Sequence, residues 1–313
     1  MNIAIFSDVH GRVLLAFKLC ARWEQEAGEK LDLVLQAGDL GAYPSEESLD
    51  RATRAHAKSD PSELGFMQDF GSYNAEVAEI LAQTTCPMIC VRGNHEDHVW
   101  LDTLEERASS PIYSIDPYQR VWMLKTGVPY TFHVEHRTEF SAIEETPSSV
   151  EQLSDGHRLS IIGVGRIAAP PGAFSNAPDP RGRANRYILP EESVRIRALR
   201  ARSCNILLTH DSARDGMIAG SGSDDITWLL SEMRPAYHFF GHYGGPCVVR
   251  KDANGVTTSC KLADLHWGKG AQQRTLDPGS MGILRWKGAD DHSFEVVDAP
   301  WLREYTPHSW RYV

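Results

Sequence analysis

The sequence lacks the long apolar run of a membrane protein. No window holds 18 consecutive apolar residues, so we expect no transmembrane helix and no membrane partner. The chain begins without the basic region of a secretory signal peptide, and a strand pattern starts at Asn2. The six cysteines form no CxxC pair and stand mostly in apolar settings, as is typical of buried thiols in a reducing cytosol. These absences favour a cytoplasmic location.

Basic residues are in the minority, and the formal net charge is −10. This balance argues against nucleic-acid binding by bulk electrostatics, although a local basic groove would still allow it. With 313 residues and 42% hydrophobic content, the chain can bury one large core or two modest ones. We interpret residues 1–313 as a single domain with insertion loops near 43–65, 135–156 and 166–187.

Short apolar runs alternate with amphipathic segments along most of the chain. The patterns predict strands at 2–6, 31–37, 87–91, 112–115, 120–124, 128–133, 158–164, 205–209 and 237–240. They predict helices at 14–26, 46–57, 66–83, 190–202 and 225–233, with another beginning near His98. The chain ends in alternating segments that favour an antiparallel-rich sheet, at 247–251, 256–260, 282–286 and 293–297. The strand-helix-strand order at the start of the chain indicates a βαβ unit and an α/β fold.

The stretch Gly-Asn-His-Glu at 93–96 follows an apolar run over 87–91 that has the pattern of a buried strand. Its polar side chains therefore lie on a loop at the tip of a strand, which is where ligands bind in open α/β sheets. Asn94 offers a carbonyl oxygen to a metal ion, and His95 offers a proton near neutral pH. The alternative is an ordinary turn with a capping Asn and a surface His.

Similar polar side chains follow four other predicted strands. Asp8 and His10 follow the first strand and can turn to the same side, and Asp39 follows the second. His210 and His242 follow two strands in the second half of the chain. Either Asp could instead cap a helix, but five strand ends with the same chemistry are hard to attribute to chance. Oxygen and imidazole donors without thiolates suit two Mn, Fe or Zn ions better than a structural zinc.

Four arginines lie in a long irregular stretch, 166–187, which also contains four prolines. Loops of this length are often functional. Arg166, Arg181, Arg183 and Arg186 could clamp an anionic substrate, since guanidinium groups bind phosphate in a bidentate manner. The alternative is a solvated basic loop that offsets the acidic surface.

In chain order, the motifs DxH, GDxG, GNHE, a lone strand-end His and GHxG resemble the calcineurin-like metallophosphoesterase superfamily. The resemblance extends from Asp8 to about Gly282, where the segment 277–282 is similar to the family's closing N-P-G-S. It implies a four-layered αββα sandwich with two mixed sheets and a metal site at the C-terminal strand tips. It also implies metal-dependent hydrolysis of a phosphoester by a metal-activated water, with a phosphodiester or a nucleotide-type substrate favoured.

The resemblance also implies roles for individual residues. Six of them would bind two divalent ions: Asp8, His10, Asp39, Asn94, His210 and His242. Asp39 would bridge the ions, with Asp8 and His10 on the first ion and the remaining three on the second. His95 would protonate the leaving-group oxygen or stabilise the transferring phosphoryl group.

The chain departs from the family pattern at two positions. Ala42 stands where GDxxD has its second Asp, and Gly244 stands where GHxH has its second His. Gly244 cannot bind a metal, so we expect a weak first site or a substitute ligand. His266 is the spare histidine, with an ordinary surface or core role as the alternative. Two other functions stay open: a phosphomonoesterase or protein phosphatase, and a non-catalytic binding scaffold on the same fold.

Overall fold

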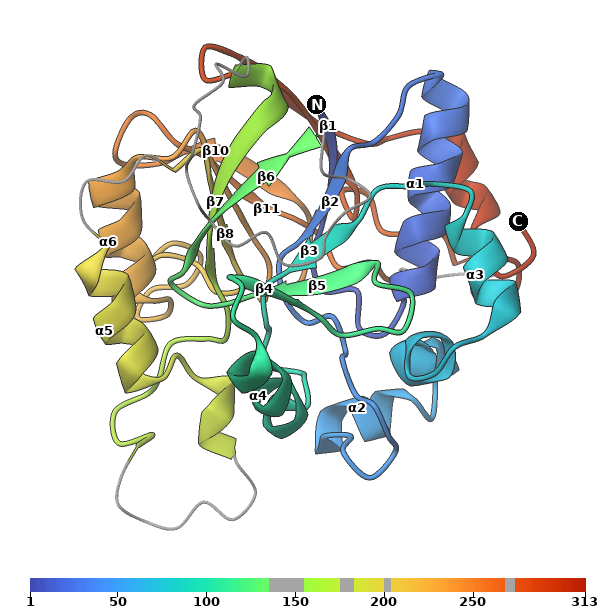
Figure 1. Ribbon diagram of the computed structural model, residues 1–313, viewed down its shortest axis with the longest axis horizontal. Helices are drawn as coiled ribbons and strands as arrows, with labels where there is room; N and C mark the ends of the chain where they lie inside the picture. Colours follow the sequence, from blue (N-terminus) through green and yellow to red (C-terminus); the bar gives the residue numbers. More distant parts are fainter. Residues whose placement is uncertain (135–154, 175–182, 200–203, 268–273) are drawn as a thin grey trace.

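The computed structural model describes residues 1–134, 155–174, 183–199, 204–267 and 274–313. Two sheets lie face to face in the middle of the molecule, and helices cover the outer face of each one (Figure 1). The order of layers is helix, sheet, sheet, helix. This arrangement confirms the predicted four-layered α/β sandwich with two mixed sheets.

The first sheet has seven strands, and its parallel centre carries much of the site described below. In spatial order it consists of β13 (Asp291–Val296), β12 (Gly282–Gly288), β1 (Asn2–Phe6), β2 (Leu33–Gln36), β3 (Met88–Cys90), β5 (Val121–Leu124) and β4 (Ile112–Ser114). The four strands β1, β2, β3 and β5 run parallel to one another, whereas β12, β13 and β4 each pair antiparallel with their neighbours.

The second sheet has six strands. In spatial order it consists of β10 (Val248–Lys251), β11 (Thr258–Lys261), β9 (Tyr237–Phe240), β8 (Ile206–Thr209), β7 (Arg158–Val164) and β6 (Pro129–His133). The antiparallel β10–β11 pair agrees with the predicted character of the chain's end, but β11 itself runs parallel to β9. The carboxyl end of β11 therefore lies at the same edge as the ends of β8 and β9.

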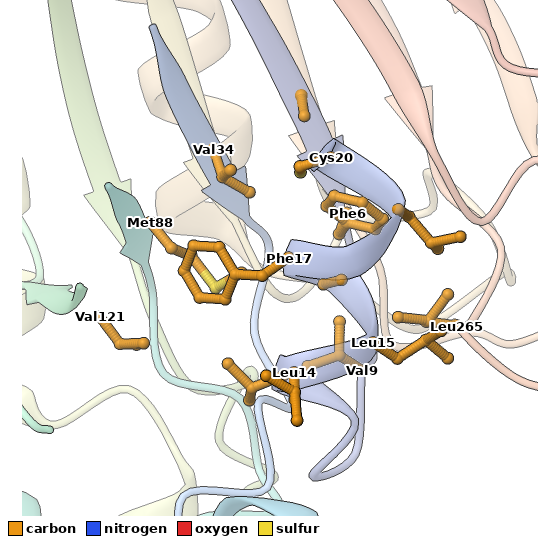
Figure 2. Packing of buried hydrophobic residues seen from close by; sticks show 14 of the residues in the cluster. Phe6, Val9, Leu14, Leu15, Phe17, Cys20, Val34, Met88, Val121 and Leu265 are labelled. Atoms are coloured by element: carbon orange, nitrogen blue, oxygen red, sulfur yellow. The ribbon is translucent and has the colours of Figure 1, made fainter. Parts of the chain in front are cut away.

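Side-chain alternation along β1 supplies two separate cores. Ile3 and Ile5 join the core between the two sheets, whereas Ala4 and Phe6 join the core under the helices. Figure 2 shows side chains of the sheet and of α1 (Val13–Ala27) meeting in this second core. Because both faces of the strand are buried, β1 reads as an uninterrupted apolar run.

Helices α1 and α3 (Ala75–Leu81) lie on the first sheet, and α5 (Pro190–Ala198) and α6 (Asp224–Met233) lie on the second (Figure 1). A third core fills the space beneath α5 and α6, with Ile196 of α5 as one of its fully buried members. Helix α4 (His98–Arg107) follows the Gly-Asn-His-Glu stretch as predicted, and η6 (Pro300–Glu304) lies near the C-terminus.

Two predicted helices are wrong in extent. The segment 66–83 is not one helix but a π-helical turn, η2 (Phe66–Phe70), followed by α3. Gly71 disfavours a continuous helix, and the side chain of Asn74 caps the start of α3 instead. The segment 46–57 is helical only in α2 (Arg51–His56), because Asp50 caps the helix there.

Three predicted loops are described to different extents. The loop 43–65 contains α2 and a 3-10 turn, η1 (Pro61–Leu64). The charged stretch 135–156 lies mostly outside the described residues, which resume at η4 (Asp155–His157). The stretch 166–187 is described at both ends and includes η5 (Arg183–Arg186). Within the described parts of the chain, no helix has the length and apolar character to span a membrane.

Candidate metal and phosphoryl site

The seven residues predicted as metal ligands or proton donor all follow strands of the two sheets. Asp8 and His10 follow β1, Asp39 follows β2, and Asn94 follows β3 together with the adjacent histidine. The remaining two histidines, at 210 and 242, follow β8 and β9. Because each set of strands is parallel, their carboxyl ends meet at one edge of the sandwich. The structure brings these side chains together, as the contacts below show.

Asp39 lies at the centre of the site and is only 3% exposed. Its Oδ1 atom is 3.4 Å from Nε2 of His210, whereas its Oδ2 atom is 3.9 Å from Nε2 of His10. The backbone N–H groups of Asn94 and His95 donate to Oδ1 at 2.7 and 2.8 Å. The two carboxylate oxygens therefore face different histidines, which is the arrangement that a bridging ligand requires.

Asp8, His10 and Asp39 place one donor atom each within 4.8 Å of one another. The backbone N–H of His242 donates to both carboxylate oxygens of Asp8, at 3.2 and 3.1 Å. Hard carboxylate oxygens and an imidazole nitrogen at this spacing fit a divalent cation.

A second donor set lies on the other side of Asp39. Nε2 of His210 is 3.1 Å from Oδ1 of Asn94, and the rings of His210 and His242 have centroids 5.0 Å apart. Nδ1 of His210 lies 3.0 Å from the carbonyl oxygen of Ala37, to which it donates, so Nε2 faces the site. This set also fits a divalent cation.

The backbone around these side chains is strained. Asp8, His10, Asp39 and His242 all have positive φ angles, of 48°, 43°, 52° and 72°. Non-glycine residues rarely adopt this region, and such residues cluster at functional sites where the surrounding fold holds them. The loops also approach closely, because a Cβ at Gly93 would clash with Asp39.

The charges of the site reflect burial and the central carboxylate. Burial alone would raise the pKa of Asp39, but His210 holds it well below its usual range. Burial alone would lower the pKa of His210, but Asp39 raises it to about 10. Burial lowers the pKa of His242 to about 4 and also lowers that of His10, so both imidazoles are neutral, as metal ligands must be. A cation that binds His210 must displace its proton.

His95 has a partner that the sequence did not reveal. Its Nδ1 atom lies 2.6 Å from Oδ2 of Asp50, and the histidine side chain is 25% exposed. Burial alone would lower the pKa of His95, but the hydrogen bond with Asp50 raises it to about 9. The imidazolium is therefore an accessible proton donor at neutral pH. The missing Asp at position 42 was the available signal for a replacement acid, but nothing in the loop singled out Asp50.

The last residue of the Gly-Asn-His-Glu stretch ties two loops together. The buried carboxylate of Glu96 accepts hydrogen bonds from the backbone N–H groups of Leu40 at 2.8 Å, Ala42 at 2.6 Å and Gly93 at 3.2 Å. These bonds join the loop that carries Asp39 to the loop after β3. The connection holds Asp39 beside Asn94, whose backbone N–H donates to it.

Of the four predicted substrate-binding arginines, the structure describes the side chains of two, Arg166 and Arg186. Arg166 is 1% exposed, and its guanidinium contacts Glu192 at 3.2 Å and Asp102 at 3.1 Å. Arg186 lies half-buried in η5. Arg181 lies outside the described residues, as does the side chain of Arg183.

His266, the predicted spare histidine, is 31% exposed, and its Nδ1 atom lies 3.8 Å from Oδ2 of Asp277. It is directed toward a surface carboxylate. Gly244, where the family pattern has a histidine, adopts a φ of +56°. Among the described residues, the first donor set therefore consists of Asp8, His10 and Asp39.

Known protein families and structures include several matches to this chain. The model of the calcineurin-like phosphoesterase family matches residues 1–245. No curated protein matches the chain. Protein TT1561 of Thermus thermophilus has a similar structure, with a TM-score of 0.51 and 14% identity over 95% of this chain and 99% of that one. That likeness supports the shared fold.

Two weaker structural matches were also found. A 5'-nucleotidase from Candida albicans SC5314 matches with a TM-score of 0.41 and 11% identity, over 97% of this chain and 52% of that one. A conserved uncharacterized protein of Streptococcus pneumoniae TIGR4, described as a predicted phosphoesterase, matches with a TM-score of 0.32 and 10% identity, over 95% and 97% of the two chains.

Proposed function

Because this chain belongs to the calcineurin-like phosphoesterase family, we propose that it uses two divalent cations to hydrolyse a phosphodiester or nucleotide-type substrate. The family accounts for metal-dependent phosphoester hydrolysis in general. The observation that carries the finer proposal is the position of Asp39, whose two oxygens face His10 on one side and His210 on the other. Asp39 is the bridging ligand in this proposal.

The remaining ligands divide between the two sides of Asp39. Asp8 and His10 serve the first cation. The second cation is served by Asn94, His210 and His242. Bound divalent ions would supply an activated water and neutralise charge that develops on the phosphoryl oxygens. Mn, Fe and Zn all accept this oxygen and nitrogen donor set.

His95 is the proton donor to the leaving-group oxygen in this proposal. Three properties support the role: it is a quarter exposed, it is protonated at neutral pH, and its ring centroid lies 5.8 Å from that of His10. Asp50 positions the ring by its hydrogen bond to Nδ1, which leaves Nε2 for the substrate.

Three described arginines that lie beside the ligand-bearing loops favour a diester over a monoester substrate. Arg12, Arg92 and Arg166 are all buried, and each contacts two carboxylates of the protein. We propose that Arg166 stabilises the fold at this edge rather than clamping the substrate. A phosphomonoester dianion needs more positive charge than a diester monoanion. These three arginines could supply that charge only if their existing ion pairs with protein carboxylates broke.

A reducing compartment also suits the protein, and we propose a cytoplasmic location. All six cysteines are free, and five of them are buried in the fold. Thiols in these surroundings remain reduced where glutathione and thioredoxin act.

The experiment that tests the function compares two chromogenic substrates. Protein stripped of metal with a chelator is assayed with bis-p-nitrophenyl phosphate and with p-nitrophenyl phosphate, before and after addition of Mn²⁺. We expect activity only with metal and a higher kcat/KM for the diester. Full activity without metal would refute the metal mechanism, and a preference for the monoester would refute the substrate class. No turnover of either compound in metal-loaded protein would favour the binding scaffold.

A further inference from the structure

Asp264 follows β11 and packs against the loop that carries Asp8. Its backbone forms an isolated parallel bridge with Ser7, and the N–H of Leu265 donates to the carbonyl oxygen of Asp8 at 3.2 Å. This position depends on β11 running parallel to β9, which brings the end of β11 to the edge where the ligands gather. Asp264 is thus a carboxylate at a further strand tip of the site.

One oxygen of this carboxylate has no protein partner. Oδ1 of Asp264 is buried and makes no hydrogen bond to any described part of the chain. A buried carboxylate oxygen without a partner is costly, and in a native protein it calls for a specific explanation.

The charged groups around Asp264 favour a cation as the partner of this oxygen. Asp264 interacts electrostatically with Asp8, a like charge, and with His10. Adjacent carboxylates repel each other, and a shared divalent cation turns that repulsion into attraction.

Two basic side chains that interact electrostatically with Asp264 form hydrogen bonds or ion pairs with other groups. Nζ of Lys261 donates to the carbonyl oxygens of Gly244 and Gly245, the second at 2.8 Å. His266 is paired with Asp277. Neither residue hydrogen-bonds the free oxygen of Asp264.

We propose that Asp264 supplies the donor to the first cation that is missing at Gly244. The proposal rests on the two-cation function above. Asp264 does not belong to the compact group in which the donor atoms of Asp8, His10 and Asp39 lie within 4.8 Å. We therefore expect its carboxylate to approach Asp8 when a cation binds. Exchanging an imidazole for a carboxylate at this position makes the first site more negative and favours a hard, oxygen-preferring ion such as Mn²⁺.

The first test measures metal binding and not activity. Metal-stripped wild-type protein is titrated with Mn²⁺ by calorimetry, alongside Asp264→Asn and a matched control, Asp277→Asn, which removes a half-exposed carboxylate from the same part of the chain. We expect two binding steps in the wild type, and a loss of at least tenfold in the affinity of one step in Asp264→Asn. Removal of a group that only hydrogen-bonds to a metal ligand typically costs about 10–100-fold in metal affinity, so removal of a direct ligand should cost no less. The control should match the wild type. Wild-type affinities for both steps in Asp264→Asn would overturn the proposal.

A second variant keeps the test decisive if Asp264→Asn folds poorly. Asp264→Cys replaces the carboxylate with a soft ligand that prefers Cd²⁺. A cysteine that contacts the metal should give an ultraviolet thiolate-to-cadmium charge-transfer band that is absent from Asp277→Cys and from the wild type with its six native thiols. No additional band in folded Asp264→Cys would overturn the proposal.

The outcomes separate this proposal from the function on which it rests. If the protein binds metal in two steps, one of which depends on Asp264, but has no phosphoesterase activity, the proposed function is refuted and Asp264 remains assigned as a metal ligand. If hydrolysis depends on metal but neither binding step changes in Asp264→Asn, the assignment of Asp264 as a ligand is refuted and the proposed function stands.

Discussion

Nδ1 of His95 lies 2.6 Å from Oδ2 of Asp50, and the other oxygen of the same carboxylate accepts a hydrogen bond from the N–H of Thr53 at 2.7 Å. Asp50 therefore caps α2 with one oxygen and holds the proposed proton donor with the other. The inserted loop 43–65 thus acts on the site, because its short helix fixes the carboxylate that orients the imidazole.

Asp50→Asn should weaken this support without removing the proton donor. Asn can still cap α2, so we expect the fold to persist. The kcat for a substrate with a poor leaving group should fall by about tenfold or more, because proton transfer depends on the position of the imidazole. Steady-state kinetics with a series of aryl diesters of different leaving-group pKa would measure this. Glu47→Gln, in the same loop and exposed, is the control, and an equal loss there would argue against a specific role for Asp50.

His95→Asn should show a larger effect of the same kind. We expect roughly a hundredfold loss of kcat or more, on the usual scale for general acid catalysis, with metal content unchanged. Diesters with poor leaving groups should lose the most, because they need the proton. Metal analysis and kinetics with good and poor leaving groups would test this. Equal losses for both would indicate that His95 stabilises phosphoryl charge and does not deliver a proton.

Asp39→Asn should reduce turnover more than Asp8→Asn does. Asp39 contacts histidines on both sides of the site, so its replacement weakens both cation sites at once, whereas Asp8 belongs to one. Metal content by mass spectrometry should fall toward zero ions per chain in Asp39→Asn and toward one in Asp8→Asn. Wild-type turnover in Asp39→Asn would show that the bridging assignment is wrong.

The sequence predicted the side chains that gather at this edge of the sandwich because each one closely follows its strand. The apolar run before Asp39 predicts β2, and the polar residue after the run marks the edge where ligands bind. Strand and ligand are thus encoded by the same few residues. The helix-breaking effects of Gly71 and Asn74 were also present in the sequence, but the apolar periodicity of 66–83 outweighed them in the prediction.

The supporting residues could not be predicted, because their contacts depend on tertiary structure. Asp50 lies 45 residues before His95, in a loop that also contains Glu46 and Glu47. Asp264 lies beside the loop of Asp8 only because β11 runs parallel to β9, and local alternation does not specify strand direction. Arg166 looked like a loop arginine in the sequence, yet it is buried between Glu192 and Asp102.

Acid should destabilise the protein partly through His238. This histidine is 1% exposed, and its Nε2 atom lies 2.8 Å from the hydroxyl of Thr209. Burial lowers its pKa from 6.5 to about 3, with a smaller contribution from Arg250. Between pH 6.5 and 3 the unfolded chain takes up a proton there that the folded chain does not. The contribution of neutral His238 to stability is therefore fully present above pH 6.5. As the pH falls below this value, the free energy of unfolding decreases by up to about 1.4 kcal/mol per pH unit.

Urea unfolding of the wild type and of His238→Gln across this range would measure the effect. The variant should be less stable at pH 7, because a hydrogen bond is altered, but its stability should fall less steeply toward pH 4. His56→Gln, at an exposed histidine, is the control and should keep the wild-type slope. The same slope in His238→Gln as in the wild type would assign the acid sensitivity to other groups.

Gly244→His should restore a ligand that the chain lacks at the first cation. The φ of +56° at this residue is unfavourable for most side chains, but His tolerates it better than β-branched residues do, and no heavy atom lies within 4 Å of the added Cβ. We expect the weaker step of a Mn²⁺ titration to tighten by about tenfold, and the same change should recover affinity in the Asp264→Asn background. Gly245→His is the matched control, since it has a φ of +68° and equally open surroundings. Equal tightening in both variants would reveal a nonspecific surface site, and an unchanged step in a folded Gly244→His protein would mean that the first cation does not sit beside this loop.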